Sequence, residues 1–273
     1  MASVPLALAA LSKDAFAQTA GGVQDVLNFA LMLEIFEAEF YKAVLGTSSV
    51  AAQNAAFAPV RAKVPATALP TLQKIRDHEI AHVAFLQSAG AVNTLNLTGA
   101  SFDFTGARGA GNGAFAGATT DLNFLLLVTQ AAEDTGVRAY KGQAPNLMSN
   151  PAVLEAALRI HSVEARHASK IRRLRRQTGA TSVKFSGTIT GGGAAAAGAD
   201  NVANPPAGAV AALNLIYAGE DNTTQGTASV TSLPNLPTTN FTSSAAATEA
   251  FDEPLTKAQV IAIVQGFFIP TLS

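Results

Sequence analysis

One pattern of glutamate, tyrosine and histidine occurs twice in this chain and restricts its fold more than any other feature. In each copy a Glu stands seven residues before a Tyr, and a later Glu stands three residues before a His. The two copies are Glu34, Tyr41, Glu79 and His82, then Glu133, Tyr140, Glu164 and His167. Residues three or seven apart lie on one face of an α-helix. The chain therefore offers two matched sets of two carboxylates and one imidazole, which is the ligand set of a dinuclear metal site in a four-helix bundle.

The hydrophobic periodicity predicts four long helices that carry these residues. Apolar side chains recur at the helical period, and Gly or Pro marks the ends of the periodic stretches. Capping residues stand at two of the starts, in the run Thr119-Thr-Asp and at Asn150 before Pro151. The four predicted helices cover about residues 22–45, 71–89, 119–142 and 151–179.

The connections between these helices favour one topology. Residues 91–118 are long enough to run the length of a bundle, roughly 30 Å for helices of about 20 residues. A bundle with one long crossover in its middle has the ferritin-like topology. The linker 46–69 is longer than a hairpin needs and has room for a short extra helix. We therefore expect an all-α, ferritin-like four-helix bundle with a long crossover between its second and third helices.

The two ends of the chain differ from the bundle, which is expected to occupy residues 21–180. Residues 1–20 hold a short apolar stretch and a small-x-small sequence, so they form either the remnant of an export leader or an apolar N-terminal helix. A leader would place the protein outside the cytoplasm, in a periplasm, at the cell surface or secreted. Residues 181–246 are a Gly-, Thr- and Asn-rich extension. A capping box at Thr256 starts a final apolar helix in 247–273, which is expected to pack on the bundle or on a partner.

The composition excludes several classes of site. The absence of cysteine excludes disulfides, zinc–thiolate sites, iron–sulfur clusters and thiol catalysis. A formal net charge of -1 gives no bulk field to attract nucleic acid or an anionic membrane. No apolar run reaches the roughly 18–20 residues that a transmembrane helix needs. All four histidines lie in the two Glu-x-x-His segments, so the imidazoles available for chemistry are concentrated there.

The doubled pattern identifies candidate ligands and catalytic residues. A dinuclear site takes one Glu-x-x-His pair from each of two helices and one Glu from each of the other two. Tyr41 and Tyr140 are the candidate catalytic residues, close enough to donate a hydrogen bond to a ligating carboxylate. Carboxylates with two imidazoles suit iron, manganese or zinc rather than copper(I), and we expect two iron ions, with manganese or a mixed pair as the alternative. The predicted ligands are Glu34, Glu79, His82, Glu133, Glu164 and His167.

Three further residues lie near the same helix faces. Glu37 follows Glu34 by three residues and is an alternative ligand or a hydrogen-bond partner of Glu34. His161 precedes Glu164 by three residues and is either an extra ligand or a residue that flanks the site. His78 lies one position off the ligand face of the second helix, so we expect it to be exposed or bonded to a neighbouring carboxylate.

The first predicted helix resembles that of the ferritin-like domain proteins related to plant desiccation-related proteins and their bacterial homologues. The segment that carries this resemblance is Asp25-Val-Leu-Asn-Phe-Ala-Leu-Met-Leu-Glu-Ile-Phe-Glu-Ala-Glu-Phe-Tyr41. The Glu-x-x-His helices and the segments 132–140, 217–222 and 251–256 extend it. In the wider ferritin, bacterioferritin and rubrerythrin superfamily, the equivalent ligands bind two irons and react with oxygen or peroxide. The resemblance implies the same for the six ligands here, and its extra loops and tail imply a dimer or small assembly rather than a storage cage.

Two functions are consistent with the sequence. The first is a dinuclear non-haem metal protein, with iron in the site, that has ferroxidase-like activity or consumes oxygen or peroxide in stress protection. The second is a non-enzymatic stress or surface protein. In that case the bundle is a scaffold, the inherited ligands persist as a buried polar network, and residues 181–273 serve assembly.

Overall fold

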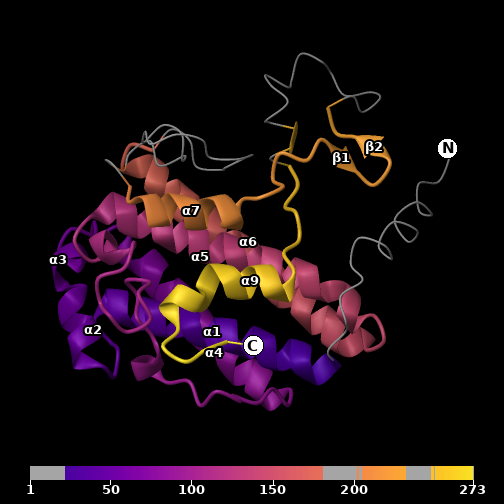
Figure 1. Ribbon diagram of the computed structural model, residues 1–273, viewed down its shortest axis with the longest axis horizontal. Helices are drawn as coiled ribbons and strands as arrows, with labels where there is room; N and C mark the ends of the chain where they lie inside the picture. Colours follow the sequence, from indigo (N-terminus) through magenta and orange to yellow (C-terminus); the bar gives the residue numbers. More distant parts are fainter. Residues whose placement is uncertain (1–21, 181–201, 203–204, 232–246, 249, 273) are drawn as a thin grey trace.

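Four long helices form the body of the protein. They are α1 (Val23–Leu45), α4 (Leu69–Ser88), α5 (Leu122–Gln143) and α6 (Pro151–Gln177). The most extensive helix contacts are those of α1 with α4 and of α5 with α6, and the two pairs face each other (Figure 1). This arrangement confirms the prediction of an all-α, ferritin-like bundle. The computed structural model describes residues 22–180, 202, 205–231, 247–248 and 250–272, so the predicted leader and most of the 181–246 extension lie outside the described residues.

Local signals fix the helix ends close to the predicted positions. Gly46 closes α1 with a φ of 76°, a left-handed conformation that glycine adopts without steric cost. Asp121 caps α5 by accepting the backbone N–H of Phe124 at 2.8 Å. Asn150 caps α6 in the same way, and Pro151 occupies the first turn, where no N–H is needed. Residues within or next to each of these helices therefore determine where it begins or ends.

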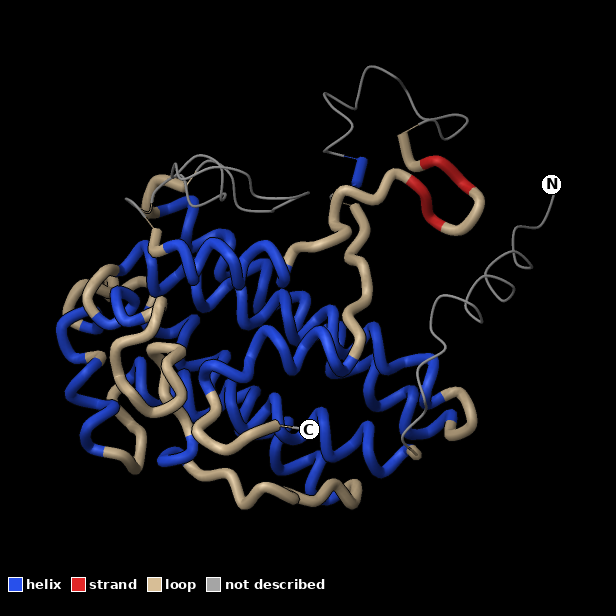
Figure 2. Tube along the Cα trace, viewed as in Figure 1, coloured by secondary structure: helices blue, strands red, loops and turns tan. Residues whose placement is uncertain are grey.

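The linker and the crossover add short helices around one end of the bundle. The linker after α1 holds α2 (Ala51–Ala56) and α3 (Ala58–Arg61), two helices where one was expected. The crossover between α4 and α5 holds the 3-10 helices η1 (Gly99–Ser101) and η2 (Ala116–Thr119), and η3 (Ala144–Leu147) joins α5 to α6. Figure 2 shows how much of the crossover is irregular chain lying against the helices.

Aromatic side chains hold the crossover against α1. The rings of Phe102 and Phe104 are buried, with centroids 5.8 and 6.1 Å from that of Phe36 on α1. Phe102 also forms a backbone bridge with Phe268, close to the C-terminus. The ring of Phe268 completes the cluster at 5.6 Å from Phe36. The end of the chain and the crossover are therefore part of the same hydrophobic core as the bundle.

The C-terminal extension packs on the α5 side of the bundle. Its elements are α7 (Ala207–Ile216), the two-stranded hairpin β1 (Thr224–Gln225) and β2 (Ala228–Ser229), α9 (Lys257–Val264) and η5 (Gln265–Phe267). Both α7 and α9 contact α5, and α9 crosses in front of the space between α1 and α5 (Figure 1). The capping box predicted at Thr256 is present.

One buried arginine ties this extension to the bundle. The guanidinium of Arg138 on α5 donates hydrogen bonds to the carbonyl oxygens of Ile216, Ala218 and Glu253. It also lies 3.2 Å from a carboxylate oxygen of Glu220. Burial lowers the pKa of Arg138 from its ordinary value, an effect that the nearby acidic groups oppose. Because three backbone carbonyls converge on one cation, the path of the extension is fixed where it leaves α7.

None of the described helices has a stretch that is apolar and long enough to cross a bilayer.

Candidate metal centre

The four bundle helices bring all six predicted ligands together in the core. Their ligand atoms form two groups, within each of which all lie within 4.8 Å of one another. One group is Glu34, Glu79, His82 and Glu164, and the other is Glu79, Glu133, Glu164 and His167. Glu79 and Glu164 belong to both groups. The two groups of possible ligands therefore overlap at these two carboxylates.

Each Glu-x-x-His turn directs its imidazole Nδ1 atom toward the carboxylates. His82 Nδ1 lies 3.1 Å from carboxylate oxygens of Glu34, Glu79 and Glu164. His167 Nδ1 lies 2.8 Å from Glu79 Oε1 and 3.4 Å from Glu133 Oε2 (the second group). Imidazole nitrogens and carboxylate oxygens that converge at these distances have the arrangement of ligands around a metal ion.

Several polar atoms of this cluster make no hydrogen bond of normal geometry with the described residues, although His167 Nδ1 and Glu79 Oε1 lie 2.8 Å apart. These buried atoms are Glu79 Oε1, Glu133 Oε2, both carboxylate oxygens of Glu164, and His167 Nδ1. An unpaired buried polar atom costs about 1–3 kcal/mol, so a group of five of them is rare unless a ligand satisfies it. All five atoms belong to the two ligand groups. The donor set therefore fits metal ions that prefer oxygen and nitrogen ligands.

The pKa values of the ligands show that several ionised carboxylates close together are unfavourable in this buried site. Burial raises the pKa of Glu79 well above its usual value and that of Glu133 to about 7. Burial also acts on Glu164, but His167 and His82 outweigh it and lower the pKa of this carboxyl to about 2. Burial disfavours the imidazolium form, yet the surrounding carboxylates raise the pKa of both histidines to about 12. Protons held here balance the carboxylates, and cations that bind in the site must displace them.

The two tyrosines of the repeated pattern bind carboxylates across the bundle. Tyr41 on α1 donates to Glu133 on α5, and Tyr140 on α5 donates to Glu34 on α1, at 2.5 Å in the second case. Seven residues of helix span about 10 Å, so a tyrosine cannot reach the Glu of its own helix. Burial is the main cause of the raised pKa of both phenols, so they remain donors. Each bond fixes the orientation of a ligand that belongs to only one of the two groups.

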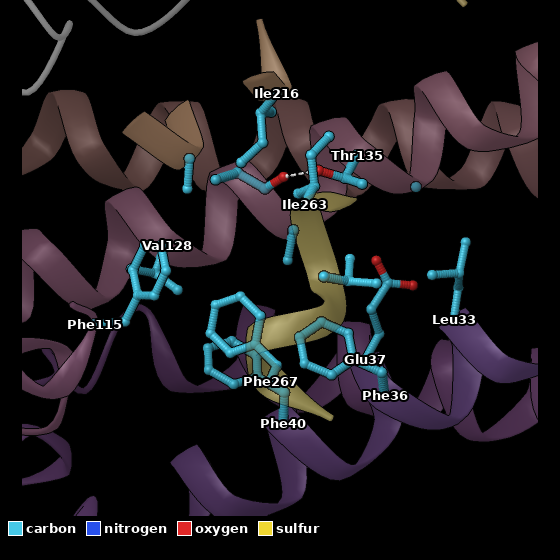
Figure 3. A pocket seen from close by; sticks show the side chains of 15 residues that line it. Leu33, Phe36, Glu37, Phe40, Phe115, Val128, Thr135, Ile216, Ile263 and Phe267 are labelled. Carbon is cyan, nitrogen blue, oxygen red and sulfur yellow. Dashed lines mark hydrogen bonds between the residues drawn. The ribbon is translucent and has the colours of Figure 1, made fainter. Parts of the chain in front are cut away.

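Glu37 lies beside the site but belongs to neither ligand group. Its carboxylate is 4% exposed and accepts no hydrogen bond from the described residues. Figure 3 shows it rising from α1 at the edge of an apolar cavity of about 40 Å³ that α9 covers. Gly136 on α5 makes room for it, because a Cβ at that position would lie 3.1 Å from Glu37 Oε1. Burial and the nearby carboxylates raise the pKa of Glu37 well above its usual value.

The two remaining histidines lie outside the ligand groups. His161 is partly buried, and burial lowers its pKa, but the geometry does not bring it to the ligands. The expectation for His78 was wrong, because its Nδ1 lies 2.9 Å from Nε2 of His167 and not beside a carboxylate. The imidazole of His78 therefore holds the Nε2 atom of His167, whose Nδ1 atom is the one that lies beside the carboxylates. His78 lies only one helix position from the ligand Glu79, and no spacing in the sequence indicated this pairing.

A second polar network adjoins the site and includes the extension. Asp134 follows the ligand Glu133 and is rotated about 100° from it around α5. It accepts a hydrogen bond from Tyr217 at 2.7 Å and forms an ion pair with Arg172 of α6. Gln130, one turn earlier, donates to the same tyrosine hydroxyl at 3.2 Å. Sequence reasoning did not identify Tyr217 as a neighbour of the site, because Tyr217 is 83 positions from Asp134 in the chain.

The metal centre is covered unequally on its sides. The side between α1 and α5 is closed by α9 and the aromatic cluster, whereas α4 and α6 touch each other much less than the members of each helix pair do. His82, on α4, is the most exposed ligand, with 12% of its side chain accessible. Among the ligands, the cluster is therefore nearest to solvent at His82.

Comparison with known proteins agrees with this architecture. A family model described as a ferritin-like domain matches residues 22–177, more than half of the chain. The match begins at α1 and ends at α6, so it spans every ligand. No curated protein and no solved structure gives a match.

Proposed function

The chain belongs to the ferritin-like domain family, and we propose that it is a dinuclear non-haem iron protein that oxidises Fe(II) or consumes oxygen or peroxide. The observation that carries the proposal is the pair of ligand groups that share Glu79 and Glu164. Carboxylates shared by two ions would hold those ions close enough to react together. A mononuclear site has no need of shared carboxylates.

Charge balance supports two divalent ions. The two groups together contain four carboxylates and two imidazoles. Four ionised carboxylates and two neutral imidazoles carry a charge of about -4, which two divalent cations neutralise. One cation would leave a net negative charge in a site whose ligands are almost completely buried. Neutrality in the core therefore favours a pair of metal ions over a single one.

Each residue then has a defined part. Glu79 and Glu164, which belong to both groups, would hold both ions, and Glu34 and Glu133 would each hold one. Bound iron would supply one-electron oxidation and reduction at two adjacent ions. Tyr41 and Tyr140 hold the two terminal carboxylates in orientation through their hydroxyl hydrogens.

Metal analysis of the full chain tests this proposal. After loading with Fe(II) and removal of free metal, we expect two iron ions per chain, one for each ligand group, and an optical signature of coupled ferric ions after exposure to air. Glu164→Gln should abolish both. Glu155→Gln, on the exposed face of the same helix, is the matched control and should change neither. Fewer than about one ion per loaded wild-type chain would overturn the proposal, given the tight binding expected of preorganised ligands.

The biological setting is part of the same proposal. The resemblance to the desiccation-related type supports a role in stress protection outside the cytoplasm, in a dimer or small assembly. The scaffold alternative has one supporting observation, the Arg138 contacts that anchor the extension to the bundle. A protein that assembles normally but binds no metal would favour that alternative.

A further inference from the structure

A second and larger cavity lies at the end of the bundle beyond Tyr140. Its volume is about 300 Å³, and it is bounded by all four bundle helices. Small side chains leave this space unfilled, because alanines of every helix face it. They are Ala30, Ala89, Ala139, Ala152, Ala156 and Ala157. The space is partly open to solvent, and its size and lining make it a candidate site for a small molecule.

The cavity wall contains one polar group with unused hydrogen-bonding capacity. Gln143, at the end of α5, is 6% exposed and lines the cavity. Its Oε1 accepts a hydrogen bond from Asn146 at 3.0 Å. Its Nε2 has no acceptor among the described residues. A buried N–H donor without a partner costs stability, so this atom identifies where an oxygen of the occupant would lie.

The remainder of the wall specifies the rest of the occupant. No Lys or Arg lines the cavity, so a free carboxylate would be buried without a countercharge. The hydroxyl of Tyr140, the other polar group at the wall, already donates to Glu34. Phe85 is 44% exposed and stands at the mouth, between α4 and α6. The volume and the mainly apolar lining with one placed polar group match the usual properties of small-molecule sites.

We infer that this cavity binds a neutral medium-chain acyl compound, such as an ester or aldehyde, whose carbonyl oxygen accepts a hydrogen bond from Gln143 Nε2. The apolar chain fills the space between the alanines and reaches Leu33 and Tyr140. None of the six metal ligands lines the cavity, so the site is distinct from the metal centre and does not depend on the proposed function. A ligand bound here would nevertheless touch the tyrosine that orients Glu34.

Calorimetric titration of the full-length protein with three matched compounds tests the inference. Methyl decanoate has the chain and a neutral acceptor, decane has the chain alone, and decanoate has a charge. We expect methyl decanoate to bind at least about fivefold more tightly than either of the others. This ratio corresponds to the net free energy of one buried hydrogen bond. Gln143→Met should remove the advantage over decane while leaving the affinity for decane unchanged. Retained decane binding shows that this variant is folded.

A cavity-filling variant supplies the second measurement. Ala157→Phe should abolish the binding of methyl decanoate and decane, whereas Ala84→Phe, at an exposed position of α4 outside the lining, should not. Equal affinity of wild type and Gln143→Met for methyl decanoate would overturn the inference, and so would a spectrum or crystal structure that places another part of the chain in the cavity. Iron content is measured on the same samples. Ester binding without iron would refute the proposed function alone, and iron without ester binding would refute this inference alone.

Discussion

The hydroxyl of Tyr140 on α5 donates a 2.5 Å hydrogen bond to Glu34 on α1, and Tyr41 on α1 returns the same contact to Glu133 on α5. Each helix of this pair therefore supplies one terminal ligand and the group that orients the other terminal ligand. The two bonds are related by the repeat in the sequence. They couple the placement of α1 against α5 to the geometry of the metal centre, because a shift of either helix disturbs both ligands.

The tyrosine bonds predict site-selective effects. Tyr140→Phe should weaken metal binding in the group that contains Glu34 by about tenfold, the usual cost of losing a residue that orients a ligand. Tyr41→Phe is its matched variant and should weaken the group that contains Glu133 instead. Titration with Fe(II) or Mn(II) followed by calorimetry resolves the two binding steps. Equal weakening of both steps in both variants would contradict the crossed arrangement.

Shared and unshared ligands should differ in stoichiometry. Glu34→Gln damages one ligand group, so the loaded protein should retain about one ion per chain. Glu79→Gln damages both groups and should leave almost none. Metal content is measured by elemental analysis after gel filtration, with circular dichroism to show that both variants are folded. A chain that keeps one ion after Glu79→Gln would show that this carboxylate is not shared.

Glu37 offers a direct test of ligand identity. Because its carboxylate lies in neither ligand group, Glu37→Gln should leave two ions per chain. Burial and the nearby carboxylates raise the pKa of Glu37, so an ionised carboxylate at this position is unfavourable in the folded protein. The amide of Gln carries no charge, so the free energy of unfolding of the metal-free protein should rise at neutral pH. A fall in metal content would instead make Glu37 a ligand.

The stability of the metal-free protein should fall as pH rises. The pKa of Glu133 is raised from 4.5 to about 7, so its contribution is complete below about pH 4.5 and is lost as pH rises through about 7. The shift corresponds to a loss on the order of 3 kcal/mol. The histidines act in the same direction from their ordinary pKa of 6.5 upward, since both pKa values are raised to about 12.

Bound metal should reverse this trend, because cation binding releases protons and strengthens with pH. Thermal unfolding of metal-free and iron-loaded protein between about pH 5 and pH 8 measures both slopes. A metal-free protein that becomes more stable over this interval would show that the carboxyls are not protonated in the folded state.

Arg138 should be essential to the attachment of the extension. Arg138→Lys keeps the charge but cannot reach three carbonyl oxygens and Glu220 at once, so we expect a loss of about 3 kcal/mol in the free energy of unfolding. Arg159→Lys, in an exposed pair with Glu155, is the control and should change stability by less than about 0.5 kcal/mol. Chemical denaturation of the two variants gives the comparison.

The helices and the ligand groups were predictable because their signals are local. Helical period, caps and glycine stops act within one segment, and Glu-x-x-His places two ligands on one turn whatever surrounds it. Bundle topology then required only the length of the crossover, which was visible in residues 91–118. The alternative between Glu34 and Glu37 was not decided by spacing; the structure places Glu34 in a group of possible ligands and Glu37 in neither group.

Relationships between helices were not predictable from one sequence. The tyrosines were expected near a ligating carboxylate, but their exchange across α1 and α5 depends on the relative height of the two helices. The contact of His78 with His167 depends on the rotation of α4 against α6. The contacts of Tyr217 and Arg138 depend on where a remote segment returns to α5. None of these distances is encoded in a local pattern, because each is set by packing in three dimensions.

The backbone bridge between Phe102 and Phe268 has a consequence for the order of events during synthesis. The aromatic face of α1 is fully covered only after residues 267–272 have left the ribosome, because Phe267, Phe268 and Leu272 are all buried in the folded protein. Until then the nascent chain presents an uncovered apolar surface, which favours association with other chains or with a chaperone. For recombinant work, a truncation that removes residues 267–272 should therefore expose this surface permanently.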